Sequence, residues 1–314
     1  MPQGWIVKAL SGYYFVLPDH AEMRDGTIQC RARGVFKKKG ISPLVGDKVL
    51  YELTENGEGT VTEILPRSSE LIRPPIANVS QAVLVFSVTE PALNLHLLDK
   101  FLVHIEKSGL DAVICFTKYD LVEEMIVDKS AAQPEQLTSL QRRGLGDVFE
   151  LYESIGYPVI VTSAKLRLGL QPILDRLSGA LSVFAGQSGV GKSSLLNAII
   201  SDLKLETNEI SQKLGRGKHT TRHVELLPLD AGGFVADTPG FSQLDFMELE
   251  VQELGICFKE FAAYAEECRF RGCLHLHEPG CKVIEAKEQA RIAESRYENY
   301  VQFLTEMKEK KRRY

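Results

Sequence analysis

Short β-rich runs separated by turn residues fill the first 66 residues of the chain. The runs cover residues 5–10, 13–17, 27–35, 47–53 and 60–64, and Gly, Pro, Asp and Asn lie between them. Glycines at positions 12, 34, 46 and 59 mark the expected bends. Strands of this length and number predict an all-β barrel of the OB (oligonucleotide- and oligosaccharide-binding) type. An SH3-like barrel would produce a similar pattern and stays open as the alternative.

From residue 78 the pattern changes to alternating strands and helices. Strands are expected at 82–88, 112–116, 158–162, 182–185 and 234–236, and helices at 95–108 and 193–200. This alternation predicts a parallel sheet with helices on both faces. From about residue 249 the pattern is helical, apart from Cys and His at 268–281. We therefore expect three domains: a barrel at 1–70, an α/β domain at 71–248 and a helical domain at 249–314.

The chain contains a complete phosphate-binding loop. Residues Gly186-Gln187-Ser188-Gly189-Val190-Gly191-Lys192-Ser193 fit the pattern G-x-x-x-x-G-K-[ST], between an expected strand and an expected helix. The glycines let backbone N–H groups turn toward phosphate oxygens, and the helix presents its positive end to them. We expect Lys192 to contact the β- and γ-phosphates of a nucleotide and Ser193 to ligate Mg²⁺.

Thr117-Lys118-Tyr119-Asp120 has the form of a guanine-reading loop. The Asp120 carboxylate can accept hydrogen bonds from the ring N–H and the exocyclic amine of guanine, whereas adenine would turn an acceptor toward it. Sites built on such a contact discriminate between substrates by about 10⁴ or more. We expect Lys118 to pack along the base and Ser163-Ala164-Lys165 to close over it. A plain surface turn is the alternative interpretation of the loop.

Two further segments have the spacing of γ-phosphate sensors. In Asp237-Thr238-Pro239-Gly240, we expect Asp237 to hold Mg²⁺ through water and the Gly240 N–H to contact the γ-phosphate. Residues 215–222 contain Thr220 and Thr221, and either hydroxyl can ligate Mg²⁺. Thr221 is the preferred ligand, with Thr220 as the alternative.

Phe241 follows Gly240 at the position where many GTPases carry a Gln that orients the attacking water. Intrinsic hydrolysis is therefore expected to be slow, with His219 orienting the water when a partner is bound. A hinge or an RNA contact is the alternative role for His219. The expected catalytic residues are His219, Lys192 and Thr221. The residues expected to bind GTP are Thr117, Lys118, Asp120, Ser163, Ala164, Lys165, Gly186, Gln187, Ser188, Gly189, Val190, Gly191, Lys192, Ser193, Ser194, Thr220, Thr221, Asp237 and Gly240.

A cluster of cysteines in the C-terminal region has the composition of a metal site. Cys268, Cys273 and Cys281 offer three thiolates, and the fourth ligand can come from His275, His277 or Cys257. Four Cys and His ligands make a closed tetrahedral zinc site of the structural kind, with no position left for a catalytic water. Buried reduced cysteines are the alternative.

Charge and hydropathy narrow the expected partners. The net charge is −5, yet basic residues gather at 31–39, 213–222 and 308–313. These clusters suggest that the protein binds a polyanionic partner at defined places on its surface. Solvated faces are the alternative interpretation. No apolar run approaches the roughly 20 residues that cross a bilayer, and the N-terminus lacks a secretory pattern. We expect a cytoplasmic protein without a membrane partner.

The base-reading loop precedes the phosphate loop here, whereas in most G proteins it follows. With its barrel and its Cys/His cluster, this order resembles the circularly permuted ribosome small-subunit-dependent GTPase A family. The resemblance covers essentially the whole chain and is most specific at residues 186–194, 215–222, 237–241 and 268–281. It implies a circularly permuted α/β P-loop GTPase domain between an OB-like barrel and a helical zinc-binding domain, and it selects His275 as the fourth zinc ligand.

The same resemblance implies a function. Members bind the small ribosomal subunit and its rRNA, are stimulated by it and act in its late maturation. GTP or GDP with Mg²⁺ and one structural Zn²⁺ are the implied cofactors, and a monomer is the simplest state. One departure is Thr117, where many GTPases have Asn; this weakens a side-chain tether rather than base selectivity. The competing interpretation is an RNA-binding scaffold in which hydrolysis is incidental, and a translation-cycle or transport GTPase is disfavoured.

Overall fold

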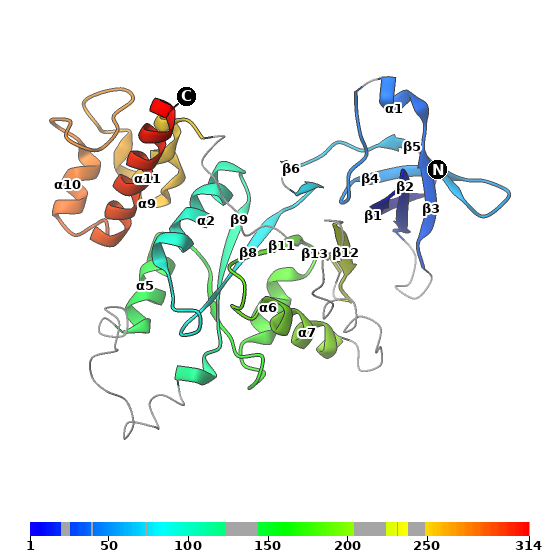
Figure 1. Ribbon diagram of the computed structural model, residues 1–314, viewed down its shortest axis with the longest axis horizontal. Coiled ribbons are helices and arrows are strands. Elements are labelled where there is room, and N and C mark those ends of the chain that lie inside the picture. The colour runs from blue at the N-terminus through cyan, green and yellow to red at the C-terminus, as the bar shows by residue number, and fades with distance from the viewer. Residues whose placement is uncertain are drawn as a thin grey trace.

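The computed structural model describes residues 1–19, 26–38, 40–72, 74–122, 144–203, 224–230, 232–237 and 249–313. A small barrel lies at one end of the molecule, an open sheet flanked by helices lies in the middle, and a helical domain lies at the other end (Figure 1). No helix among the described residues combines the length and the apolar character needed to span a bilayer.

The N-terminal barrel consists of β1 (Gln3–Leu10), β2 (Tyr13–Pro18), β3 (Ile28–Ala32), β4 (Lys48–Leu53) and β5 (Gly59–Ile64). The strands pair in the order β1-β2-β3-β5-β4, and β4 pairs with β1 to close the barrel. Only the β3–β5 pair is parallel. Alternate positions such as Val16, Val49 and Val61 fill the interior and have no exposed surface. The predicted closed five-stranded barrel is confirmed.

The third strand ends earlier than the prediction of 27–35. Strand β3 stops at Ala32, and residues Gly34–Lys38 form the short helix α1. The helical turn buries Phe36 against the barrel core while Val35 remains 42% exposed. Packing of one aromatic side chain therefore overrides the β-propensity of the run.

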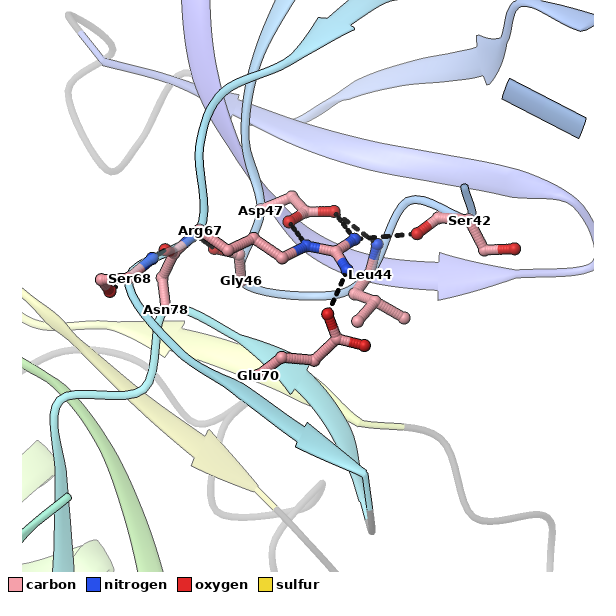
Figure 2. Close-up of polar contacts among 8 residues, drawn as sticks. All are labelled: Ser42, Leu44, Gly46, Asp47, Arg67, Ser68, Glu70 and Asn78. Atoms are coloured by element: carbon pink, nitrogen blue, oxygen red, sulfur yellow. Dashed lines mark hydrogen bonds and ion pairs between the residues drawn. The ribbon is translucent and has the colours of Figure 1, made fainter. Parts of the chain in front are cut away.

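A tight joint connects the barrel to the chain that follows it (Figure 2). The carboxylate of Asp47 is fully buried and accepts hydrogen bonds from Arg67 Nε at 2.7 Å and Arg67 Nη2 at 2.8 Å. Arg67 also donates to Glu70 Oε2 at 2.6 Å and to the Ser42 carbonyl at 2.8 Å. The hydrogen bonds to Asp47 are the main cause that raises the pKa of the Arg67 guanidinium above its ordinary value, and the hydrogen bond to Glu70 adds to it.

Backbone contacts complete this joint. Strands β6 (Glu70–Ile72) and β7 (Pro75–Ala77) form a hairpin, and the Ala77 N–H donates to the Val45 carbonyl at 2.9 Å. Asn78 Nδ2 donates to the Gly46 carbonyl at 2.9 Å. Gly46 has φ +90°, and a Cβ there would lie 2.1 Å from the Ala77 carbonyl oxygen, so only glycine fits. The hairpin begins at Glu70. The domain limits at 70 and 248 stay predictions.

The central sheet contains β8 (Gln81–Ser87), β9 (Asp111–Thr117), β10 (Val159–Val161), β11 (Leu181–Ala185), β12 (Glu225–Pro228) and β13 (Phe234–Asp237). Its order is β10-β9-β8-β11-β13-β12, with β12 antiparallel to β13 and the other pairs parallel. The short strand β12 was not expected from the sequence. Beyond it the sheet continues into the barrel, because β12 also pairs with β1.

Helices cover both faces of this sheet, as predicted. Side chains of β8 alternate between them: Leu84 and Phe86 pack with α2 (Leu95–Lys107) and α5 (Leu145–Ile155), whereas Val83 and Val85 pack with α6 (Leu170–Leu177) and α7 (Lys192–Leu203). Helix α2 begins at Leu95, and the side chain of Asn94 caps it by accepting from the Leu97 N–H at 2.9 Å. Helices α5 and α6 were not expected from the sequence.

The C-terminal domain contains the 3₁₀ helix η3 (Val251–Cys257) and the helices α9 (Lys259–Ala265), α10 (Lys282–Glu288) and α11 (Glu294–Arg313). It lies beside α2 (Figure 1). A buried polar network joins the two. Arg296 of α11 donates to Asp99 Oδ1 of α2 at 2.5 Å and to Glu260 Oε1 of α9 at 2.6 Å. Arg296 and Asp99 are each only about 1% exposed, so the network holds the two domains together out of contact with water.

Candidate functional site

The phosphate loop occupies residues 186–191, between β11 and α7. Gly186 has φ +145°, and a Cβ there would lie 2.1 Å from the Val85 carbonyl oxygen of β8. Gly189 and Gly191 also adopt positive φ, 81° and 98°. The glycines therefore allow the loop to run against β8 and to turn into the helix, as the phosphate-binding interpretation requires.

Lys192 and Ser193 begin α7, directly after this loop. Lys192 Nζ lies within the curve of the loop, 2.6 Å from the Gly186 carbonyl and 2.5 Å from the Gln187 carbonyl. Burial lowers the pKa of its ammonium. Ser193 and Ser194 are exposed at the start of the helix. A phosphate bound to the loop would therefore meet a cation and two hydroxyls at the positive end of a helix.

The base-reading loop is hydrogen-bonded directly to the phosphate loop. Thr117, at the end of β9, is 4% exposed, and its hydroxyl contacts the Val190 carbonyl. The same hydroxyl lies 3.3 Å from the Phe86 carbonyl of β8. The hydroxyl of Thr117 thus links the two loops.

Asp120 and Ser163 come together from two different strand ends. The Ser163 hydroxyl donates to Asp120 Oδ1 at 2.6 Å, and both side chains are buried. The hydrogen bond holds the carboxylate in one orientation and leaves its second oxygen for a base. Lys118 adopts φ +59°, and its Nζ donates to the Glu90 carbonyl at 2.5 Å. Ala164 and Lys165 follow in the loop after β10.

Four possible metal ligands gather in the C-terminal domain. The ligand atoms of Cys268, Cys273, His275 and Cys281 all lie within 4.8 Å of one another. Cys281 Sγ is 3.9 Å from Cys268 Sγ and 3.3 Å from His275 Nδ1. A tetrahedral zinc ion with Zn–S bonds of about 2.3 Å places sulfur atoms about 3.8 Å apart, so the four residues fit such an ion.

The surroundings of these residues also suit a cation. Burial lowers the pKa of His275, which favours the neutral imidazole that binds metals. Burial raises the pKa of the Cys273 thiol to about 12, and a bound metal cation acts in the opposite direction by favouring the thiolate. Gly255 lies against the imidazole, since a Cβ there would be 3.3 Å from His275 Cδ2.

Comparison with known proteins gives consistent matches along the whole chain. A family model described as the RsgA GTPase matches residues 64–247, and one described as the RsgA N-terminal domain matches residues 3–61. The chain belongs to the RsgA GTPase family. A relative from Bacillus subtilis, named small ribosomal subunit biogenesis GTPase RsgA, is 50% identical over 100% of both chains. A relative of the same name from a Geobacillus species is 51% identical, again over 100% of both.

Two solved structures resemble this RsgA-family chain. YloQ, described as a circularly permuted GTPase, has a TM-score of 0.79 and 43% sequence identity, covering 99% of this chain and 96% of its own. YjeQ from Thermotoga maritima has a TM-score of 0.80 and 37% identity, covering 97% of this chain and 98% of its own. The expected circularly permuted GTPase fold is confirmed.

Some of the expected site residues of this RsgA-family protein lie outside the described residues. These are His219, Thr220, Thr221, Gly240 and Phe241; Asp237 is described only as the last residue of β13. Strand β13 is parallel to β11, with Ala236 beside Val183. Asp237 therefore comes at the same edge of the sheet as the phosphate loop. The roles predicted for all these residues stay predictions.

The structure of the C-terminal cluster in the RsgA-family chain distinguishes among the three candidates for the fourth metal ligand. His275 lies with the three thiols, whereas Cys257 Sγ packs against the Glu253 carbonyl at 3.5 Å and His277 is exposed. Sequence reasoning missed Glu278, whose carboxylate accepts N–H bonds from Leu274 at 2.9 Å and Leu276 at 2.8 Å and so shapes the ligand loop. No rule of sequence spacing predicts that an acidic residue between metal ligands will accept hydrogen bonds from the backbone of their loop.

Proposed function

We propose that this chain hydrolyses GTP to GDP and phosphate while bound to the small ribosomal subunit, which stimulates it, and that it acts in late maturation of that subunit. The observation that carries the proposal is the contact between Thr117 and Val190, because it joins the predicted guanine-reading loop after β9 to the phosphate loop after β11, with β8 between the two strands. The names of the full-length relatives supply the ribosomal part of the proposal.

In this proposal each loop has a separate task. Asp120 reads guanine, while the backbone of residues 186–191 and Lys192 bind the phosphates. Ser193 and Thr221 would hold a Mg²⁺ ion, which would supply positive charge to the phosphates. His219 orients the attacking water. The described residues predicted to bind GTP come at the carboxyl ends of β9, β10, β11 and β13.

The flanking domains provide the partner contacts. The barrel, residues 1–70, and the C-terminal domain, residues 249–314, bind rRNA through their basic segments, and Cys268, Cys273, His275 and Cys281 hold one structural zinc ion. In the barrel, the guanidinium of Arg31 lies 4.7 Å from the ring centre of Tyr13, an arrangement that also suits a nucleobase. We propose that the protein works as a monomer in the cytoplasm, where it meets its subunit.

Hydrolysis of GTP with and without purified small subunits tests the proposal, with Lys192→Ala as the blank. A large increase confined to small subunits, and absent with large subunits, is expected. His219→Ala should lose most of the stimulated rate while it still binds GTP. A full stimulated rate in that variant would remove His219 from the mechanism.

The second candidate function is an RNA-binding scaffold in which nucleotide only sets conformation. Phe241 favours it, because phenylalanine cannot orient a water molecule. Tight binding to small subunits with a flat hydrolysis rate would support this alternative.

A further inference from the structure

The barrel contacts the central sheet at the edge that continues into the γ-phosphate sensors. Strand β1 pairs with β12, with Lys8 opposite Glu225. Lys8 Nζ lies 3.1 Å from Glu225 Oε2, and the two side chains are 30% and 35% exposed. On the next strand, the ring centre of Phe234 lies 5.5 Å from that of Trp5. An ion pair and an aromatic contact therefore join the barrel to both strands of the β12–β13 hairpin.

The apolar core also runs through this contact without a break. Leu226 of β12 and Ala236 of β13 are nearly fully buried and belong to the same packed cluster as Ile6 and Val7 of β1. Side chains packed this closely transmit a shift of one strand to its neighbour, because a close-packed interior resists local compression. A shift of the hairpin is therefore expected to reach β1.

The position of this hairpin in the sequence gives the contact its importance. Strand β12 starts at Glu225, four residues after Thr221, and β13 ends at Asp237, the first residue of the second predicted sensor. In GTPases, segments of this kind are ordered by the γ-phosphate and Mg²⁺ and are released on hydrolysis. A change in either segment therefore reaches the strand that continues from it.

A second attachment of the barrel lies beside β1, where the Ile6 N–H donates to the Asp47 carbonyl at 2.9 Å. The pair of Asp47 with Arg67 and the hydrogen bond from Asn78 to the Gly46 carbonyl fix the barrel to the chain that leads into β8. The barrel is thus attached to the chain that leads into β8 and also contacts the hairpin, and both contacts adjoin β1. Movement of the hairpin changes one contact relative to the other.

We propose that the β1–β12 contact couples the barrel to the nucleotide, so that a partner on the barrel and the γ-phosphate influence each other through Lys8 and Glu225. As a coupling between two binding events, it acts equally in both directions. The identity of the partner, the small ribosomal subunit, rests on the proposed function above. The coupling itself is a property of the free protein.

Charge reversal tests the coupling without changing the packed core. Lys8→Glu and Glu225→Lys each place like charges opposite each other, and the double variant restores the pair. Half-exposed pairs contribute modestly, so we expect each single variant to change the ratio of the dissociation constants for a non-hydrolysable GTP analogue and GDP about two- to fivefold. The double variant should return to the wild-type ratio, as measured by calorimetry on the full chain.

The matched control is Lys287→Glu in the C-terminal domain. Lys287 also makes an ion pair of 3.1 Å, with Glu294, and its side chain is 29% exposed. This variant carries the same change in net charge and should keep the wild-type ratio. An unchanged ratio in both Lys8→Glu and Glu225→Lys overturns the coupling, as does a double variant that fails to recover.

The same variants are then assayed with saturating small subunits. We expect Lys8→Glu and Glu225→Lys to lose about two- to fivefold in stimulated rate, the double variant to recover, and Lys287→Glu to match wild type. Wild-type stimulation in both single variants overturns the transmission from the partner. If the wild-type protein is not stimulated, the proposed function fails, and the affinity ratio of the free protein still decides the coupling.

Discussion

The buried network between α2 and the C-terminal domain allows a quantitative prediction. Arg296 donates to Asp99 Oδ1 at 2.5 Å and to the two oxygens of Glu260 at 2.6 and 3.0 Å. Asp99 also accepts from the Tyr152 hydroxyl at 2.7 Å and from Asn299 Nδ2 at 2.6 Å. One cation therefore faces two carboxylates in a site closed to water.

Arg296→Met keeps most of the aliphatic stem and removes the charge. Asp99 and Glu260 are then buried without a cation, and breaking a buried pair in this way costs about 3–5 kcal/mol. Since about 1.4 kcal/mol corresponds to a factor of ten, opening of this interface should become roughly a hundred to several thousand times more frequent. Neutralising both acids in the same chain, with Asp99→Asn and Glu260→Gln, should recover much of the loss.

Amide hydrogen exchange read by mass spectrometry measures this opening directly, through the protection of peptides from α2 and α11. The control is Lys107→Met, which removes a cation from the same interface. Lys107 pairs with Glu253 at 2.6 Å, but the side chains are 41% and 38% exposed, so water replaces the contact and exchange should change only a few-fold. Equal effects of the two variants, or unchanged exchange in Arg296→Met, would refute the reasoning from burial.

Three further predictions concern the loops, the joint and the metal. Thr117→Val removes the hydroxyl that contacts the Val190 carbonyl, so GTP and GDP should both bind a few-fold to about tenfold more weakly in calorimetry; unchanged affinities would contradict this. Asp47→Asn weakens the clamp on Arg67, and trypsin should cut after Arg67 roughly ten to a hundred times faster, whereas an unchanged rate would mean that the backbone contacts suffice. Elemental analysis of the wild-type protein should give roughly one equivalent of zinc, and Cys281→Ser should lose this zinc but keep GTP binding; full zinc content in the variant would exclude the proposed ligand set.

The parts of the fold that could be predicted from sequence are those with strict local rules. The glycines of the phosphate loop follow from its backbone geometry, and the apolar strands such as β8 and β9 are long enough to show buried character. Strand β12 has only four residues, one of them Pro228, and it pairs with Lys8 of a distant strand. No local pattern could predict it.

The candidate site shows the same division. Asp120 was predicted from its motif, but its hydrogen bond from Ser163 joins residues 43 positions apart and depends on how the strand ends meet. Asp99 and Arg296 look in sequence like ordinary charged positions of two amphipathic helices. Their burial follows from the packing of the C-terminal domain on α2. The periodicity of residues within one helix carries no information about such packing.

The order of the sheet has a consequence for synthesis on the ribosome. Strands β8 and β9 are made before β11, although β11 lies between β8 and β13. Helix α2 likewise emerges long before its counterion, because Asp99 and Arg296 are 197 residues apart. At about 5–20 residues per second, the nascent chain carries an unpaired Asp99 for roughly 10–40 s. A chain that ends before residue 296 never covers the charge of Asp99. The last helix, α11, therefore completes the packing of α2, a helix made much earlier in translation.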